Sequence, residues 1–266
     1  MNEQPQTWHY GLVARWWAEF NVPDPAELAF YRGVIEPDGQ PALDLACGAG
    51  RLLLPLLSAG LDVDGCDISP DMLAFCGAGA AKQGLTPLLY QQAMHDLELP
   101  RRYQTIYICD SFGLGGQRDQ DAAALRRCYD HLVPGGTLVF SHYLPNDDSE
   151  RWSYWLPEQR QRLPEAWSGA GNRKRTEDGD EIELRARTVD LDPMEQRLTL
   201  EMRAELWREG RLVAQEDRLL QENLYFRNEI LLMLTQAGFA DVAVRAGYGT
   251  KELTANDTML VFIARR

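Results

Sequence analysis

The sequence predicts an α/β fold, with a mostly parallel sheet that carries helices on both faces. Short apolar segments at 42–46, 61–66 and 105–109 alternate with stretches in which apolar residues recur at helical spacing. A glycine turn joins the first apolar segment to a leucine-rich helix, which is the order of a βαβ unit. The 266 residues, 45% of them hydrophobic, are enough for one domain with an insertion.

Two helices are predicted ahead of the first strand, within residues 8–36. Apolar residues of the first helix follow helical spacing, namely Leu12, Val13, Trp16, Trp17 and Phe20. The second helix begins at Asp24, with proline at its first position and Glu27 at its third. The next helix is predicted over 50–59, where Pro55 removes a backbone donor and should introduce a kink.

The turn after the first strand predicts a ligand site. Gly48 and Gly50 lack a Cβ atom, so the backbone can turn tightly and a ligand can lie against it. The helix that follows directs its amide groups and its positive dipole end toward the same space. Asp44 and Asp67 stand at the ends of two successive strands, where a carboxylate can accept both hydroxyl protons of a ribose. The pattern therefore favours an adenosine-bearing cofactor.

Two other interpretations of this turn stay open. A nicotinamide-dependent oxidoreductase would use a third glycine near the pyrophosphate, but Leu53 occupies that position and Asp44 would repel a pyrophosphate. A glycine turn in an unrelated α/β protein is the other interpretation, with Asp67 only capping the helix that follows Ser69. That interpretation leaves the two acids unexplained as a pair.

The stretch 42–72 resembles the class I S-adenosylmethionine (SAM)-dependent methyltransferases of the small-molecule type. LVPGGTLVF and LTQAGFADV extend the resemblance, which covers 40–145 and 225–266. It implies a Rossmann-like, seven-stranded sheet that ends in an antiparallel pair. In this family the equivalents of Asp44, Gly48 and Gly50 form the first motif, and the equivalent of Asp67 binds the ribose. The implied activity is methyl transfer from SAM to oxygen, nitrogen or carbon of a small-molecule acceptor.

The resemblance suggests further cofactor contacts. Ala46, Ile68 and Met72 adjoin the motif positions and are expected to touch the cofactor. Family members often have an acid after the third strand that reads the adenine amino group, but Ala93 stands there. Adenine recognition is therefore expected to rest on Gln92 and the Met94 backbone. This departure keeps open a non-catalytic, SAM-binding module.

The N-terminal helices offer weaker candidates. In related enzymes such a helical segment covers the cofactor like a lid, so Tyr10 and Trp16 are candidate cofactor contacts. Ordinary packing of the tryptophans is the equal alternative.

The catalytic candidates follow the fourth and fifth strands. Asp110 comes directly after 105–109, and His142 and Tyr143 come directly after 137–141, where ligands of open α/β sheets bind. A base is needed only when the acceptor atom carries a proton. Asp110 can equally cap a turn, and His142 can hydrogen-bond into the core. The histidines have no metal-ligand spacing, so no metal is expected.

The chain divides into a helical lid (1–38), a SAM-binding core (40–145), an inserted segment (146–222) and a C-terminal helix with two strands (223–266). The inserted segment holds three alternating runs at 181–190, 197–207 and 211–220, which predict an antiparallel meander with one apolar face. We expect it to cover the acceptor pocket. Dimerisation is its alternative role, so a monomer and a homodimer both remain open.

Composition limits the partners and the compartment. The net charge of -13 repels phosphate backbones, so no nucleic acid is expected, and the one tight basic run, 173–175, is expected in a solvated loop. No apolar run reaches ~18 residues, so no membrane span is expected. The N-terminus lacks a secretion signal, and the five cysteines form no CxxC pair, which favours buried thiols in the cytoplasm.

Overall fold

The computed structural model describes residues 7, 9–115 and 117–266, which form two β-sheets. The larger sheet has the strand order β10-β11-β5-β4-β1-β2-β3. Strands β1 to β5 run parallel, and β11 is antiparallel to both β5 and β10, so the predicted mostly parallel fold is confirmed. The strands are β1 (Ala42–Leu45), β2 (Val63–Asp67), β3 (Leu89–Gln91), β4 (Tyr103–Ile108), β5 (Leu132–Tyr143), β10 (Asp241–Ala246) and β11 (Met259–Arg265).

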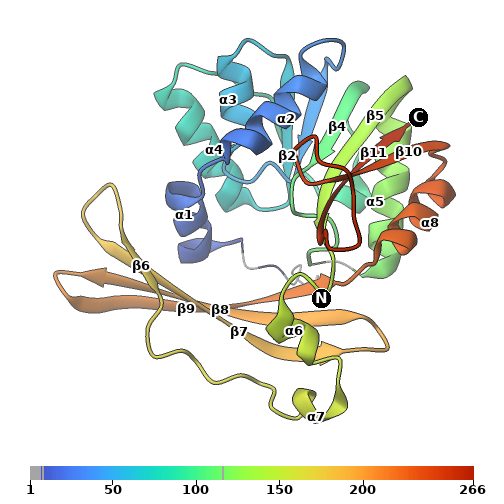
Figure 1. Ribbon diagram of the computed structural model, residues 1–266. Helices are drawn as coiled ribbons and strands as arrows, with labels where there is room; N and C mark the ends of the chain where they lie inside the picture. Colours follow the sequence, from blue (N-terminus) through green and yellow to red (C-terminus); the bar gives the residue numbers. More distant parts are fainter. Residues whose placement is uncertain (1–6, 8, 116) are drawn as a thin grey trace.

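Helices cover both faces of this sheet, as Figure 1 shows. On one face α2, α3 and α4 bury Tyr31, Leu53 and Cys76 against the strands, and on the other α5 and α8 bury Leu125 and Ile230. Each face therefore has its own apolar core, and the strands are buried between the two. The helices are α2 (Pro25–Ile35), α3 (Leu53–Ser58), α4 (Pro70–Lys82), α5 (Arg118–His131) and α8 (Arg227–Ala237), with a 3-10 turn at Met94–Asp96.

Helix α3 is shorter than predicted. It begins at Leu53 instead of residue 50, because residues 48–52 are taken up by turns. Pro55 is consequently the third residue of the helix, where a backbone amide has no intrahelical acceptor in any case. The helix predicted over 50–59 is therefore present but begins later, and Pro55 lies in its first turn and not in its interior.

The inserted segment forms a second, antiparallel sheet with the strand order β6-β7-β8-β9. Its three long strands correspond to the predicted meander, but the fourth, β6, was missed. The basic run 173–175 lies in β6 and not in a loop, because Arg173 stacks on Trp207 at 4.0 Å and pairs with Glu183. The elements are α6 (Ser149–Ser153), α7 (Pro157–Arg160), β6 (Asn172–Arg175), β7 (Glu181–Asp192), β8 (Arg197–Arg208) and β9 (Arg211–Asn223).

Helix α1 (Gly11–Phe20) joins the second sheet to the core (Figure 1). Its Val13 and Trp16 pack with Ile182 and Met202 of the second sheet. At its N-terminus the Gly11 amide donates to the Asp71 carboxylate of α4 at 2.7 Å. The next amide, that of Leu12, donates to the Glu216 carboxylate of β9 at 3.2 Å. One helix end is thus bound by acids from both halves of the molecule.

A second junction lies on the far side of the same space. The loop after β4 pairs with the end of β9, since the Gly115 amide donates to Gln221 and the Asn223 amide donates to Gly113. Gly113 has φ +89°, and a Cβ atom there would lie 2.9 Å from the Asn223 carbonyl oxygen. Glycine is therefore needed for this close approach. Within the described residues, no helix has the length and apolarity required to cross a membrane.

Candidate active site

A cavity of about 1820 Å³ lies between the carboxyl ends of the parallel strands and the second sheet. Its wall includes the glycine turn after β1, the ends of β2 and β4, and the inner face of β7, β8 and β9. Single ligands usually occupy pockets of roughly 300–1,000 Å³. The cavity therefore has room for a cofactor and an acceptor side by side.

The glycine turn has the backbone conformation that its sequence predicts. Ala46, Gly48 and Gly50 have φ values of +65°, +55° and +86°. A Cβ atom on Gly50 would lie 2.7 Å from the Cys76 sulfur, so this residue also allows α4 to pack closely. At Gly48 the nearest atom would be Met72 Cε at 3.5 Å, so only its conformation requires glycine. Ala46, Gly48, Gly50 and Met72 lie on the cavity wall, whereas Cys76 does not.

Asp67 is held rigidly at the end of β2. Its carboxylate accepts hydrogen bonds from the Gly48 amide and from the Ser69 amide, both at 2.8 Å. Burial raises the pKa of Asp67, and these two amides counteract part of that rise. The side chain is 8% exposed and faces the cavity, so it can accept further hydrogen bonds from a ligand there.

Asp44 is the second predicted acid of the cavity wall. It lies at the β1 end and is 3% exposed. Burial raises the pKa of Asp44 to about 7, because the desolvated carboxylate is disfavoured. A cationic ligand group beside it would favour the ionised form.

The other predicted contacts on this side also line the cavity, namely Ile68, Met72, Gln92 and Met94. The Gln92 amide is, however, already bonded, because it donates to the Glu98 carbonyl at 3.1 Å and accepts from the Glu98 amide at 2.8 Å. It closes the loop after β3 in this structure. Asp96, on the 3-10 turn that follows, also lines the cavity.

The two cofactor contacts predicted in the N-terminal segment, Tyr10 and Trp16, do not line the cavity. Trp17 lines the cavity, whereas Trp16 packs against β7 and β8 with Lys174 4.6 Å from its ring. Tyr10 is the N-cap residue of α1 and is likewise outside the described cavity wall. Helical spacing places both tryptophans on the apolar side of α1. It does not reveal which of them faces the second sheet and which faces the cavity.

Of the three catalytic candidates, two line the cavity and one is buried in the core. Asp110 and Tyr143 line the cavity, and Asp110 has φ +52°. Ser141 Oγ accepts from the Asp110 amide at 2.9 Å and donates to its carboxylate at 2.5 Å, which orients the acid. His142 is 5% exposed, and its Nε2 donates to the Tyr225 carbonyl at 3.2 Å. His142 is therefore a core residue outside the described cavity wall, and its burial lowers its pKa to about 4.

Burial lowers the pKa of His142, but it raises the pKa of the two candidates that face the cavity. It raises the pKa of Asp110 and raises that of Tyr143 to about 12. Asp110 is the only carboxylate among the three candidates, and it faces the cavity, which makes it the candidate proton acceptor.

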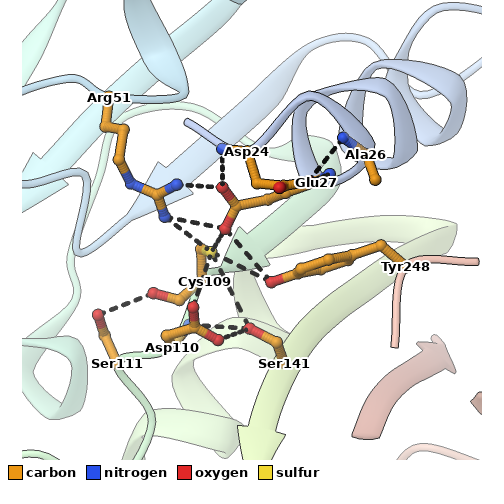
Figure 2. A network of polar contacts seen from close by, with 9 residues as sticks. All are labelled: Asp24, Ala26, Glu27, Arg51, Cys109, Asp110, Ser111, Ser141 and Tyr248. Carbon is orange, nitrogen blue, oxygen red and sulfur yellow. Dashed lines mark hydrogen bonds and ion pairs between the residues drawn. The ribbon is translucent and has the colours of Figure 1, made fainter. Parts of the chain in front are cut away.

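Figure 2 shows a polar network that the sequence analysis missed. The Arg51 guanidinium, from the glycine turn, donates to both carboxylate oxygens of Glu27 in α2. The Cys109 thiol donates to Glu27 at 2.7 Å, and the Tyr248 hydroxyl donates to the same oxygen at 3.4 Å. Glu27 also accepts from the Asp24 amide. The capping position of Glu27 was visible in the sequence, but the side chains that donate to it lie 24 to 221 residues away.

Charge balance explains why this buried acid is tolerated. Burial alone would raise the pKa of Glu27, but the Arg51 ion pair and the Cys109 hydrogen bond bring it below its usual range. Glu27, Cys109 and Asp110 are a described group with atoms close enough together to hold a metal ion. Burial raises the pKa of the Cys109 thiol, and Arg51 already neutralises Glu27, so the group is built as an ion-pair network.

Comparison with known proteins confirms the resemblance to methyltransferases. Residues 42–136 match a family model described as "Methyltransferase domain". A dTDP-3-amino-3,6-dideoxy-alpha-D-glucopyranose N,N-dimethyltransferase from Streptomyces fradiae is 33% identical over 137 residues, which are 51% of this chain and 48% of that enzyme. A ubiquinone biosynthesis O-methyltransferase from Paraburkholderia xenovorans is 27% identical over 49% of this chain and 58% of its own. The chain spans about half the length of these curated relatives.

Solved structures extend the likeness of the fold to nearly the whole chain. The sugar N-methyltransferase KedS8 from Streptoalloteichus matches with a TM-score of 0.70 and 19% identity over 100% of both chains. A SAM-dependent methyltransferase from Clostridium acetobutylicum matches with a TM-score of 0.71 and 19% identity over 95% of this chain and 97% of its own. The second sheet therefore belongs to a known arrangement of this fold.

Proposed function

We propose that this protein is a SAM-dependent methyltransferase that acts on a small-molecule acceptor. The observation that carries the proposal is the pair of buried acids, Asp44 and Asp67, on neighbouring strand ends with the glycine turn between them. The names of the relatives favour nitrogen or oxygen as the methylated atom.

The residues fit the groups of SAM one by one. Asp67 has acceptor capacity for ribose hydroxyls, and buried Asp44 suits an ammonium group that would pair with its charge. The turn at Ala46, Gly48 and Gly50 lets the cofactor approach the backbone. A dinucleotide would instead bring a pyrophosphate next to Asp44, which argues against a nicotinamide cofactor.

SAM, when bound, would supply an electrophilic methyl group for transfer to a lone pair of the acceptor, with the carbon–sulfur electron pair left on sulfur. The chain's contribution is to align the reactants and exclude water, which can supply roughly 7–11 kcal/mol. Asp110, oriented by Ser141, is placed to take the proton that a hydroxyl or ammonium acceptor must lose. Tyr143 borders the same space and can orient the acceptor.

We also propose a division of labour along the chain. Residues 40–145 bind the cofactor, 1–38 form a lid, 146–222 cover the acceptor, and 223–266 complete the sheet. The five cysteines are free, which supports a cytoplasmic protein. Nucleic acid and membranes are not proposed as partners, and a monomer and a homodimer both fit the proposal.

Calorimetry with SAM, S-adenosylhomocysteine, NAD and NADP tests the cofactor assignment. We expect the first two ligands to bind and the last two not to bind. Asp67→Asn should weaken SAM binding about tenfold or more, because hydrogen bonds to a charged acceptor contribute roughly 1.5–3 kcal/mol each. Asp62→Asn, at an exposed acid paired with Arg101, is the matched control and should bind as the wild type does. Preferential dinucleotide binding would refute the proposal.

A further inference from the structure

The second sheet contributes a defined wall to the acceptor side of the cavity. Four of its lining side chains are apolar: Ala186, Leu200, Met202 and Leu220. The fifth is Glu222, near the end of β9. Ala186 is exposed although it lies on the inner face of the sheet, which is the condition of a residue that borders open space. An acceptor in this space meets an apolar surface with one carboxylate at its edge.

Glu222 differs from three other acids of the cavity wall. The Glu27, Asp67 and Asp121 carboxylates each accept hydrogen bonds from neighbouring groups. Within the described part of the chain, no hydrogen bond or ion pair joins the Glu222 carboxylate to another residue. Burial raises its pKa, and the charge of Arg151, which also lies on the cavity wall, lowers it in part. Glu222 is partly buried, so its carboxylate has lost some of its water without gaining a protein donor, and a ligand that donates to it would compensate for that loss.

Its backbone holds Glu222 close to the end of β4. Leu114 forms a β-bridge with Glu222, and the flanking hydrogen bonds join Gly115 to Gln221 and Gly113 to Asn223. The loop from residue 111 to 115 starts directly after Asp110. Glu222 and Asp110 therefore both line the cavity, one from the second sheet and the other from the end of β4, and residues 111–115 connect the two.

The remaining charges of the wall oppose an anionic acceptor. Among described wall residues, the lysines and arginines are Arg51, Lys82 and Arg151. Each already has an acidic partner: Glu27 for Arg51, Glu177 for Lys82 and Asp148 for Arg151. Phosphate recognition relies on available arginine or lysine side chains. The wall thus attracts cations and offers no unpaired basic side chain to a diphosphate.

We propose that Glu222 determines acceptor specificity by binding a protonated amino group, and that the acceptor is an apolar amine without a nucleotide or phosphate handle. This proposal rests on the proposed methyltransferase function and narrows its acceptor. It separates this chain from its Streptomyces fradiae relative, whose name specifies a dTDP-linked amino sugar. Leu200, Met202 and Leu220 would contact the apolar body of the acceptor while Glu222 accepts from its ammonium.

The test compares three cyclohexane derivatives that differ in one group, namely the methylamine, the methanol and the carboxylate, with thymidine diphosphate as a fourth probe. Each is titrated calorimetrically into the wild-type protein saturated with S-adenosylhomocysteine. We expect the amine to bind at least tenfold more tightly than the alcohol, and the carboxylate and the diphosphate to bind most weakly. Glu222→Gln should bring amine and alcohol within about threefold of each other.

Glu209→Gln, in the exposed turn between β8 and β9, is the matched control and should keep the amine preference. Thymidine diphosphate binding more tightly than the amine, no amine binding up to the solubility limit, or an unchanged preference in Glu222→Gln would each overturn the proposal. The initial S-adenosylhomocysteine titration reports separately on the proposed function. A protein that fails to bind it but keeps the Glu222-dependent amine preference would contradict the methyltransferase assignment alone.

Discussion

Individual residues of the site combine burial with charge, and Asp44 shows the consequence for pH most clearly. Its pKa in the folded protein is about 7, whereas an unfolded aspartate has a pKa of about 3.9. Between these values the folded protein holds a proton that the unfolded chain has released. The free energy of unfolding contributed by Asp44 therefore falls as the pH rises from about 4 to about 7 and is constant above that.

Asp44→Asn removes this pH-dependent cost. We expect the variant to be more stable than the wild type at pH 8, by on the order of 2 kcal/mol, and to match it near pH 4. Urea unfolding at both pH values measures the difference. SAM affinity should show the complementary effect: it should rise with pH up to about 7 in the wild type and be lower and nearly independent of pH in Asp44→Asn. A pH-independent affinity in the wild type would contradict the ammonium role of Asp44.

For the Glu27–Arg51 pair we expect the opposite pH dependence of stability from that of Asp44. The folded-state pKa of Glu27 lies below its usual value, so the stability it contributes is present above the unfolded pKa of about 4.3 and is lost as the pH falls through the folded value. Glu27→Gln leaves the Arg51 guanidinium without its charge partner and should cost about 3 kcal/mol at pH 7. The wild type and the variant should converge once the pH falls below the folded-state pKa of Glu27. Equal urea midpoints at pH 7 would show that the pair is not stabilising.

At the scale of elements, local patterns were predictable and long-range partners were not. The glycine turn, the Asp24 cap and the position of Asp67 at a strand end depend on residues a few positions apart, and all were found from the sequence. Strand β6 was missed because it is short and strongly basic, and its stability comes from Trp207 and Glu183 in other strands. The Glu27 network was missed for the same reason.

Helix α1 illustrates what periodicity leaves undecided. Trp16 and Trp17 are adjacent, yet one packs on the second sheet and the other borders the cavity. Trp16→Ala should destabilise the protein by about 3–5 kcal/mol, as for buried aromatic residues in general, and Trp16→Phe should recover most of the loss. Trp17→Ala should cost less stability but weaken SAM binding several-fold. Urea unfolding and calorimetry together test this, and the reverse pattern would place Trp16 in the site.

At the scale of the whole molecule, the cavity depends on two sheets held in a fixed relation. Acids from α4 and β9 bind the N-terminus of α1 on one side, and the loop after β4 pairs with β9 on the other. The outer face of the second sheet is occupied by cross-strand ion pairs, such as Arg185 with Glu205, and by Trp167 stacked between Arg187 and Arg203. Its inner face is therefore the one with apolar surface available to a ligand.

A crystal structure with S-adenosylhomocysteine is the most direct test of this account. We expect both ribose hydroxyls to donate to Asp67, the ammonium to lie beside Asp44, and the sulfur to face the part of the cavity that Asp110 and Glu222 border. The space beyond the sulfur should be open toward Leu200 and Met202. A ligand bound away from Asp67, or a sulfur directed away from Asp110, would contradict the central claim that the two strand-end acids and the second sheet together form a methyl-transfer site.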